Sequence, residues 1–586
     1  MERARKPTAA PKSQSAEQIR AQLRADVEHL AERTQFGHAQ GITVAAIRSY
    51  WSGLAANIAI TPPPAGGSTP HGDMEAAATR FGGLLAGLPV AEAAYHLSLL
   101  YTTLLPVHWR SRHGVFYTPP ALASRLLTQA EGAGLNWATA RVIDPAAGAA
   151  AFLIPAAERI LGALPTCTPA IALQNLSTRL RGWERDEFSA WMGQVFIEAV
   201  ALPLLREFKR KLPPVILVGD SLEREIPGRS YDLVIGNPPF GRLRLAANQR
   251  ARFSRSLYGH ANLYGVFMDL AVRLASKDGL VSFLTPSSFL AGEYFKNLRA
   301  LMWNEAPPVR IEFVTARKGV FEDVLQETVL ATYKKGGQRS EITVGHLGAT
   351  QGSVILADEV GGFSLPTEPT EPWFMPRHAD EAQIAQRLRS LPDRLEDWGY
   401  RVSTGPLVWN RHKNQLRDKP SRNAIPLIWA ESISADGHFE FRSEKRNHRP
   451  YFQLTEDDGW LVVDKPFVLL QRTTAKEQAR RLIAAEMPAS FLRKHGRVTV
   501  ENHINMLVPM GLKPAVSPKL LAAFLNSKAA DRAFRCLSGS VAVSAYELES
   551  LPLPSAKDLK SLVGTSISQE KVDEVCSALY SVADDA

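Results

Sequence analysis

An apolar run that ends in two prolines places the strongest constraint on the folding of this chain. Residues 232–236 (Asp-Leu-Val-Ile-Gly) have the composition of a buried strand, and residues 237–240 (Asn-Pro-Pro-Phe) follow at once. Proline has no N–H to donate to a neighbouring strand, so two in succession end the strand at Asn237. The sequence therefore predicts a rigid strand end that presents an amide, two main-chain carbonyls and an aromatic ring.

This strand end suits a flat base that carries an exocyclic amino group. The side-chain oxygen of Asn237 and the carbonyl of Pro238 can accept its two N–H bonds, and the ring of Phe240 can stack on the base. Asn-Pro turns are common in proteins of every function. Whether these four residues form a catalytic site or an ordinary turn therefore has to be judged from the segments around them.

Strands alternate with helical stretches between about residue 110 and residue 335. This alternation predicts a parallel, doubly wound α/β sheet, in which ligands bind at the carboxyl ends of the strands. The predicted strands are 141–143, 180–183, 215–218, 231–235, 281–284, 309–314 and 328–333.

The chain has 586 residues, which is too many for one ordinary domain. Periodicity, Pro-rich stretches and charge divide it into six parts. We expect a disordered basic tail (1–16), a helical N-terminal region (17–109), an α/β domain (110–335), a connecting region (336–400), a mixed α+β domain (401–555) and a polar C-terminal tail (556–586). The Pro- and Gly-rich residues 61–73 read as a linker within the helical region.

Charge and cysteine content narrow the class of protein. The net charge is +9, and residues 401–500 carry 18 Lys and Arg against 11 Asp and Glu, a surplus of 7 that favours a polyanionic partner. Cys167, Cys536 and Cys576 lack paired spacing, which excludes a disulfide framework and a Cys-based zinc site and fits a reducing cytoplasm. An apolar run of about 18 residues is absent, so we expect a cytoplasmic protein without a membrane span.

Two segments have the residues of a nucleotide-like cofactor site, and a third has those of a helix start. Residues 144–153 (Asp-Pro-Ala-Ala-Gly-Ala-Ala-Ala-Phe-Leu) follow the first core strand, and their small side chains allow the backbone to approach a ligand. Glu184 ends the second strand, where a carboxylate can accept ribose hydroxyl protons, and Asp186 suits the cap of the next helix. Thr118, in Tyr-Thr-Pro-Pro, suits the N-cap of an amphipathic helix. Each segment singly is also compatible with an ordinary turn or surface loop.

In this order, the segments resemble the motifs of gamma-class N6-adenine DNA methyltransferases of restriction–modification systems, the family of the TaqI modification methylase. Residues 113–120 match motif X, 144–153 motif I, 237–240 the catalytic motif, 262–274 motif V and 319–333 motif VIII. The resemblance covers residues 110–335 closely and 400–555 loosely. It implies a Rossmann-like domain, S-adenosylmethionine as methyl donor, and flipping of the target adenine out of the duplex.

The resemblance also assigns roles to individual residues. It implies catalysis by Asn237, Pro238 and Phe240, with Phe240 and Phe321 stacking on the target base. It implies a cofactor site made of Tyr117, Thr118, Asp144, Ala146, Gly148, Glu184, Asp220, Asn237 and Phe267. Phe267 and Phe321 are equally compatible with ordinary core positions. No metal ion is needed for this chemistry.

Three positions depart from the family pattern. Ala150 replaces the second glycine of motif I, while Arg185 and Ser221 stand where apolar residues usually enclose the cofactor adenine. These departures put cofactor affinity in doubt. They also support an alternative, a catalytically weak DNA-binding protein with a methyltransferase fold. If the cofactor is bound, the surface that encloses its adenine would instead come from the aliphatic stem of Arg185, Leu222 and Phe267.

The basic region is the predicted DNA reader. Arg and Lys can pair with guanine edges or phosphates, although a basic run is also typical of a solvated face. The candidates are Trp409, Arg411, Lys413, Arg442, Arg446, Arg472, Arg493, Lys494 and Arg497. The expected partners are double-stranded DNA and a separately encoded restriction endonuclease, with the chain itself a monomer or weak dimer.

Other methyltransferases remain as alternatives. A modification subunit of a multisubunit restriction enzyme would depend on a separate specificity subunit, which the C-terminal domain argues against. Protein glutamine methyltransferases share Asn-Pro-Pro but are shorter, and cytosine-N4 enzymes usually have Ser or Thr before the prolines. The Pro-Asp…Asp/Glu-x-Lys pattern of nucleases is absent from the N-terminal region, so we expect no cleavage activity.

Overall fold

The computed structural model of the chain describes residues 38–54, 57–106, 118–226, 230–314, 327–349, 355–465, 467–473, 480–537 and 542–581, with residues 22, 25–27 and 30. These residues form two compact units. The first unit contains Met1–Gly241 and Leu270–Leu284, and the second contains Arg242–Asp269 and Thr285–Ala586. The chain therefore passes between the units three times, and one boundary lies directly after the Asn-Pro-Pro-Phe motif.

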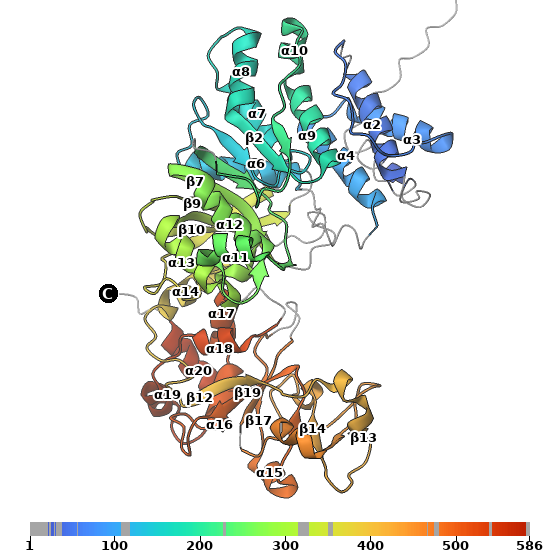
Figure 1. The fold of residues 1–586 in the computed structure, drawn as a ribbon. Coiled ribbons are helices and arrows are strands. Elements are labelled where there is room, and N and C mark those ends of the chain that lie inside the picture. Colours follow the sequence, from blue (N-terminus) through green and yellow to red (C-terminus); the bar gives the residue numbers. More distant parts are fainter. Residues whose placement is uncertain are drawn as a thin grey trace, which may run out of the picture. The chain divides into compact units, whose positions relative to one another are not determined.

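A parallel sheet forms the centre of the first unit (Figure 1). Its strands are β1 (Val142–Asp144), β2 (Leu180–Glu184), β3 (Ile216–Val218), β4 (Tyr231–Gly236) and β7 (Ala275–Pro286), in the order β7-β4-β1-β2-β3. All four pairings are parallel. The predicted doubly wound α/β class is confirmed. All five strands predicted in this unit are present, four with shifts of one residue or two at their ends, while β7 begins six residues before the predicted 281–284.

Helices pack on this sheet. They include α7 (Leu153–Gly162), α8 (Pro169–Arg179) and α9 (Glu187–Val200), which contact β1, β2 or β3. The first unit also contains α6 (Pro120–Gly132) and α10 (Leu202–Phe208), while α12 (Leu263–Leu274) crosses the unit boundary. Asp186 caps α9 as predicted, because its carboxylate accepts the Ser189 N–H at 2.9 Å. The predicted N-cap role of Thr118 is wrong. Pro119 occupies the N-cap position of α6, and the Thr118 hydroxyl is used elsewhere.

The helical N-terminal region belongs to the first unit. Its helices are α2 (Ala39–Gly53), α3 (Asp73–Leu85) and α4 (Val90–Leu104). Thr61, in the predicted linker, donates to the Glu198 carboxylate at 2.8 Å, and the Trp191 indole N–H donates to the Thr61 carbonyl at 2.8 Å. These bonds attach the linker to α9. Residues 61–73 thus connect two helices while being held on the α/β core.

Four strands of the second unit are neighbours in a sheet, in the order β11-β10-β8-β9. They are β8 (Pro308–Val314), β9 (Thr328–Lys334), β10 (Ile342–Ala349) and β11 (Ile355–Phe363). Strands β8 and β10 pair in parallel, while β8–β9 and β10–β11 are antiparallel. Helices α11 (Ala247–Arg252), α13 (Lys296–Glu305) and α14 (Ala382–Leu388) and the short pair β5 (Arg242–Leu243) and β6 (Ala261–Asn262) also belong to this unit.

The rest of the second unit is mixed α+β. One sheet has the order β12-β19-β16-β17 and another β13-β15-β14-β18. Their strands are β12 (Tyr400–Thr404), β13 (Leu416–Arg417), β14 (Ala424–Ile428), β15 (Tyr451–Gln453), β16 (Val468–Gln471), β17 (Ala484–Glu486), β18 (Thr499–Val500) and β19 (Ile504–Pro509). The helices are α15 (Ala489–His495), α16 (Pro518–Leu525), α17 (Lys528–Leu537), α18 (Ala545–Ser550), α19 (Ala556–Val563) and α20 (Gln569–Tyr580).

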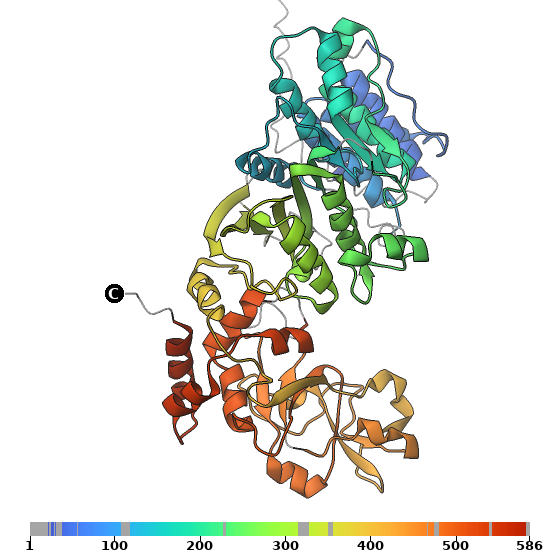
Figure 2. The same cartoon turned by 60° about the vertical axis from the view of Figure 1, so that its left-hand side comes forward.

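Two segments expected to be peripheral contain folded core. The predicted connecting region, 336–400, includes β10, β11 and α14 and contributes the fully buried Trp373 and Trp398. The predicted tail, 556–586, contains α19 and α20, which lie side by side in dark red in Figure 2. Their apolar faces join a buried cluster that includes Leu559 and Tyr580. Both segments read as peripheral because their apolar residues are spaced among Pro, Glu and Ser.

Among the described residues, no single helix is long and apolar enough to cross a membrane. Helices α9 and α10 reach that length and composition only together, and they are bent by 74° at their junction.

A close contact between α2 and α3 depends on a glycine. A Cβ added at Gly82 would lie 1.9 Å from the Ala46 carbonyl oxygen, whereas a Cβ at the exposed Gly83 would meet only the Ser49 hydroxyl, at 3.6 Å. We predict that Gly82→Ala lowers the free energy of unfolding by about 1–3 kcal/mol because the helices must separate. Gly83→Ala should leave it unchanged or raise it, since alanine favours the helix. Thermal unfolding of both variants tests this, and equal behaviour would contradict it.

Candidate active site at the strand ends

The parallel pairing of β1 and β4 brings two predicted site residues together. Val142 pairs with Leu233 and Ile143 with Val234, so Asp144 lies at the same sheet edge as Asn237. The two strand ends are very close, since a Cβ added at Gly236 would lie 2.6 Å from the Asp144 Oδ1 atom. Only glycine fits beside this carboxylate.

Asn237 is held by the segment that resembles motif X. Its Nδ2 atom donates to the Thr118 hydroxyl oxygen at 3.2 Å. Thr118 is buried, while Asn237 and Phe240 are half-buried. This bond uses one of the two amide N–H donors and orients the amide, so that its oxygen can still accept from a ligand. The structure thus brings together two residues that are 119 positions apart in the sequence.

Asp144 is a buried carboxylate with one unsatisfied oxygen. Its side chain is 1% exposed, its Oδ1 atom accepts the Ala146 N–H at 2.9 Å, and its Oδ2 atom makes no hydrogen bond with any described residue. Burial raises the pKa of Asp144 to about 8, and the nearby Glu184 adds to this effect. A cationic group beside Oδ2 would offset the cost of burial. The geometry therefore fits an ammonium ligand.

Glu184 is fixed by two main-chain donors. Its Oε2 atom accepts the Gly148 N–H and its Oε1 atom accepts the Asp186 N–H, each at 2.8 Å. Burial raises the pKa of this carboxyl above its ordinary value. Each carboxylate oxygen has a further lone pair, so both can accept a hydroxyl proton without moving. This is the arrangement expected for a ribose site at the end of β2.

At Ala150, the loop between β1 and α7 has the left-handed backbone conformation that usually requires glycine. Gly148 has φ 51° and Ala150 has φ 69°, so both adopt the left-handed conformation. The Ala150 N–H donates to the Ala147 carbonyl at 2.8 Å, and the Ala150 side chain is fully buried. The methyl group costs about 1–2 kcal/mol of backbone strain in this conformation. The replacement of glycine therefore stores strain in the loop without opening it.

Ser221, the second departure from the family pattern, connects two loops of the site. Its hydroxyl donates to the Pro145 carbonyl at 2.5 Å, which fastens the loop after β3 to the loop after β1. The neighbouring Asp220 accepts the Leu222 N–H at 2.9 Å through Oδ1, and Leu222 is buried. Arg185, the third departure, is exposed. Ser221 thus has a structural use that an apolar residue lacks.

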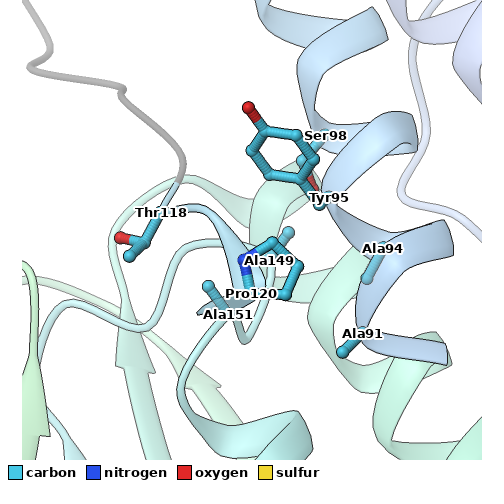
Figure 3. A pocket seen from close by; sticks show the side chains of 8 residues that line it. All are labelled: Ala91, Ala94, Tyr95, Ser98, Thr118, Pro120, Ala149 and Ala151. Atoms are coloured by element: carbon cyan, nitrogen blue, oxygen red, sulfur yellow. The ribbon is translucent and has the colours of Figure 1, made fainter. Parts of the chain in front are cut away.

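Helix α4 borders the same loop, which the sequence did not predict. A small pocket lies between α4, the start of α6 and the motif I loop; it is lined by Ala91, Ala94, Tyr95, Ser98, Thr118, Pro120, Ala149 and Ala151 (Figure 3). Further along α4, the Tyr101 ring packs on Phe188 with centroids 4.7 Å apart, next to Asp186. The N-terminal region therefore forms one side of the pocket beside the motif I loop. The small residues of α4 were the sequence signal for such a pocket wall, but they are equally typical of a helix that packs closely against another helix.

The structure accounts differently for the remaining predicted cofactor and base-stacking residues. Tyr117 and Phe321 lie outside the described residues. Phe267 is buried in α12, in the part of that helix that belongs to the second unit. Ala146 and Gly148 lie in the motif I loop, where their main-chain N–H groups bind Asp144 and Glu184.

The predicted DNA-reading residues all lie in the second unit. Most are exposed, namely Arg411, Lys413, Arg446, Arg493, Lys494 and Arg497. Three make contacts inside the protein. Trp409 packs edge-on against Trp429, with centroids 6.1 Å apart, Arg442 forms ion pairs with Glu440 and Glu444, and Arg472 donates to the Asn502 carbonyl at 3.1 Å. Their roles as DNA contacts stay predictions.

The sequence containing the Asn-Pro-Pro-Phe motif matches a known family. Residues 205–321 match the profile described as Eco57I restriction-modification methylase. The chain carries a restriction–modification methylase domain. The matched residues include β4, the Asn-Pro-Pro-Phe motif and α12.

The similarity of the chain to curated relatives extends beyond that domain. The chain is 27% identical to Type II methyltransferase M.PstI of Providencia stuartii over 362 residues, which cover 59% of this chain and 70% of the relative. It is 26% identical to Type II methyltransferase M.BsuBI of Bacillus subtilis over 332 residues, covering 56% of this chain and 66% of the relative. The chain thus spans about two thirds of the length of these relatives.

A solved structure shares the fold of the chain. The type IIL restriction-modification enzyme MmeI, determined in complex with DNA, aligns with a TM-score of 0.50 and 12% identity. The alignment covers 96% of this chain and 92% of that chain.

Asp144 should make stability depend on pH. Its pKa is about 8 in the folded protein, against an ordinary value of 3.8 for an aspartate in an unfolded chain. Between these values the unfolded chain loses this proton first, so the free energy of unfolding falls as pH rises from about 4 to about 8. We predict that Asp144→Asn raises stability at pH 7 and reduces this slope, measured by denaturant unfolding at several pH values. The control is Glu225→Gln, an exposed acid of the same unit; an unchanged slope for Asp144→Asn would contradict the prediction.

Proposed function

We propose that this protein is a site-specific DNA methyltransferase that transfers a methyl group from S-adenosylmethionine to N6 of a flipped-out adenine, as the modification enzyme of a restriction–modification system. One observation carries the proposal. The Asn237 amide is oriented by Thr118 so that its oxygen is available to a ligand, and it lies at the same sheet edge as Asp144, whose buried Oδ2 atom has no partner among the described residues. The Asn237 oxygen, which can accept from an amino group, therefore lies at the same edge as the Asp144 carboxylate, which can bind a cation.

The residues at the strand ends fit S-adenosylmethionine. Asp144 Oδ2 would hold the ammonium group of its methionine part, and Glu184, fixed by two N–H bonds, would accept the ribose hydroxyl groups. Asp220, after β3, would bind the adenine amino group of the cofactor. When bound, the cofactor supplies an electrophilic methyl group on a sulfonium sulfur.

The protein's own residues prepare the target nitrogen. An adenine N6 inside a duplex is out of reach, so the nucleotide must leave the stack at a cost of a few kcal/mol. Stacking on Phe240 offsets part of this cost, by about 1–3 kcal/mol. The Asn237 oxygen and the Pro238 carbonyl accept the two N6 protons, which directs the nitrogen lone pair out of the ring plane. The catalytic contribution is positioning and electrostatic stabilisation.

Two further observations support DNA as the substrate. The surplus of Lys and Arg is concentrated in residues 401–500, and most of the DNA-reading candidates are exposed. The fold is that of an enzyme, MmeI, that was determined in complex with DNA. We propose that the second unit supplies the sequence-reading surface, and that a separately encoded endonuclease uses the same recognition site.

Asn237→Ala should abolish methylation and spare DNA binding. The substitution removes the oxygen that accepts an N6 proton while leaving the strand end in place. We expect adenine methylation at one sequence motif in the genome of a host that expresses the wild-type chain, and none with the variant, by single-molecule sequencing. Methylation of cytosine would overturn the adenine assignment. Near wild-type methylation by the variant would remove Asn237 from the catalytic role.

Thr118→Val should separate positioning of Asn237 from cofactor binding. Valine keeps the shape of threonine but cannot accept the Asn237 N–H bond, so the amide loses its fixed orientation. We expect kcat to fall by about tenfold, equivalent to about 1.4 kcal/mol, with S-adenosylmethionine affinity unchanged in calorimetry. Thr118→Ser, which keeps the hydroxyl, is the control and should retain most activity. A parallel loss of cofactor affinity would instead assign Thr118 to a cofactor contact.

A further inference from the structure

The segment that follows the Asn-Pro-Pro-Phe motif is strongly cationic. Residues 242–262 contain five arginines, Arg242, Arg244, Arg250, Arg252 and Arg255, and no aspartate or glutamate. Pairing of Arg242 with Asn262 and Leu243 with Ala261 closes the segment into a loop. Arg255 is paired with Asp269 and Glu305, both at 2.7 Å. Arg242, Arg244 and Arg250 are exposed.

Two exposed tyrosines lie on the same loop and on the segment packed against it. The Lys296 Nζ atom lies 3.6 Å from the centre of the Tyr258 ring, and the Tyr294 and His260 rings are 5.4 Å apart. Tyr258 is 37% and Tyr294 45% exposed. Both rings therefore keep surface that a ligand can contact while their neighbours hold them in place.

Hydrogen bonds and a close contact fix this arrangement. The Asn297 side chain donates to the Leu257 carbonyl at 2.7 Å, and the Arg250 guanidinium donates to the Gly259 carbonyl at 2.8 Å. Gly259 has φ 64°, and a Cβ there would lie 2.8 Å from the Tyr294 ring. The two segments, which contain α11 and the start of α13 (Figure 1), therefore form one surface.

We name this surface the basic aromatic patch, made of Arg242, Arg250, Tyr258, His260, Tyr294 and Lys296. The one acidic residue within 242–262 and 293–297 is Glu293, which is exposed beside Tyr294. Cations with exposed rings are the chemistry that binds a nucleic acid strand, because phosphates pair with the cations and sugars or bases pack on the rings.

Covalent geometry ties the patch to the catalytic strand end. Arg242 follows Phe240 by two residues. Because consecutive Cα atoms are 3.8 Å apart, the Arg242 Cα atom lies within about 7.6 Å of the Phe240 Cα atom. Arg242 is therefore within reach of the backbone of a nucleotide that stacks on the Phe240 ring.

We infer that the basic aromatic patch holds the DNA backbone beside the base that enters the Asn237 site, through sequence-independent contacts of Arg242, Arg250 and Lys296 with phosphates. Tyr294 packs on the sugar or on an unstacked neighbouring base. This inference rests on the proposed function, because it assigns the patch to the same substrate. The patch contributes affinity and register, while base reading belongs to residues 401–500.

The test measures binding of the full chain to a duplex of arbitrary sequence at several salt concentrations. The double variant Arg242→Gln, Lys296→Gln removes two cations, and the slope of log affinity against log salt should become less steep by about 1.8. Lys557→Gln, Lys560→Gln is the matched control, since it removes two exposed cations of α19 from the same unit. The control should keep the wild-type slope.

Tyr294→Ala gives an independent readout. It should raise the KM for DNA several-fold, whereas Tyr294→Phe should behave as wild type. S-adenosylmethionine affinity should be unchanged in every variant. If the patch and control double variants lose DNA affinity equally, net charge alone explains the loss and the inference fails. An unchanged salt slope together with an unchanged KM for DNA would also overturn the inference.

These outcomes separate the patch from the proposed function. If the wild-type chain methylates DNA while the patch variants bind and methylate it normally, the inference fails and the proposed function stands. If the wild-type chain binds duplex DNA through the patch but methylates no base, the proposed function fails and the DNA-binding surface stands. Selective binding of RNA over duplex DNA would contradict both.

Discussion

The parallel pairing of β1 with β4 is the constraint on which the site depends. It puts the ends of two strands level, so that Asp144 and the Asn-Pro-Pro-Phe motif share one edge. The closeness is possible because Gly236 has no side chain. Every other contact of the site is arranged around this edge. Glu184 fixes the loop after β1 from the neighbouring strand, Ser221 fastens the loop after β3 to it, and Thr118 orients the amide.

Much of the first unit could be predicted from the sequence because its signals are local. Strands β1 to β4 are short apolar runs ended by acids, glycines or prolines, and parallel topology then gathers their ends. The cap role of Thr118 could not be predicted correctly, because choosing between Thr118 and Pro119 requires knowing that Asn237 takes the hydroxyl. The role of α4 was also missed, since Ala91, Ala94 and Ser98 have no pattern that separates a pocket wall from helix packing.

The second unit was harder to predict for a different reason. Its sheets consist of strands of two to nine residues that pair over long sequence distances, for example β12 with β19 and β14 with β18. Short strands leave weak periodicity, and pairing over such distances has no sequence signal in a single chain. Residues 336–400 and 556–580 consequently read as connections, although they supply fully buried residues such as Trp398.

The threefold passage of the chain between the units restricts how this protein can be divided. The first unit is discontinuous, because β7 is contributed by residues that return after α12. A fragment ending at Gly241 would lack β7, and β4 would become an edge strand with unpaired main-chain groups beside the Asn-Pro-Pro-Phe motif. Replacement of the rest of the second unit by that of a relative is therefore simplest after β7, where the chain leaves the first unit for the last time.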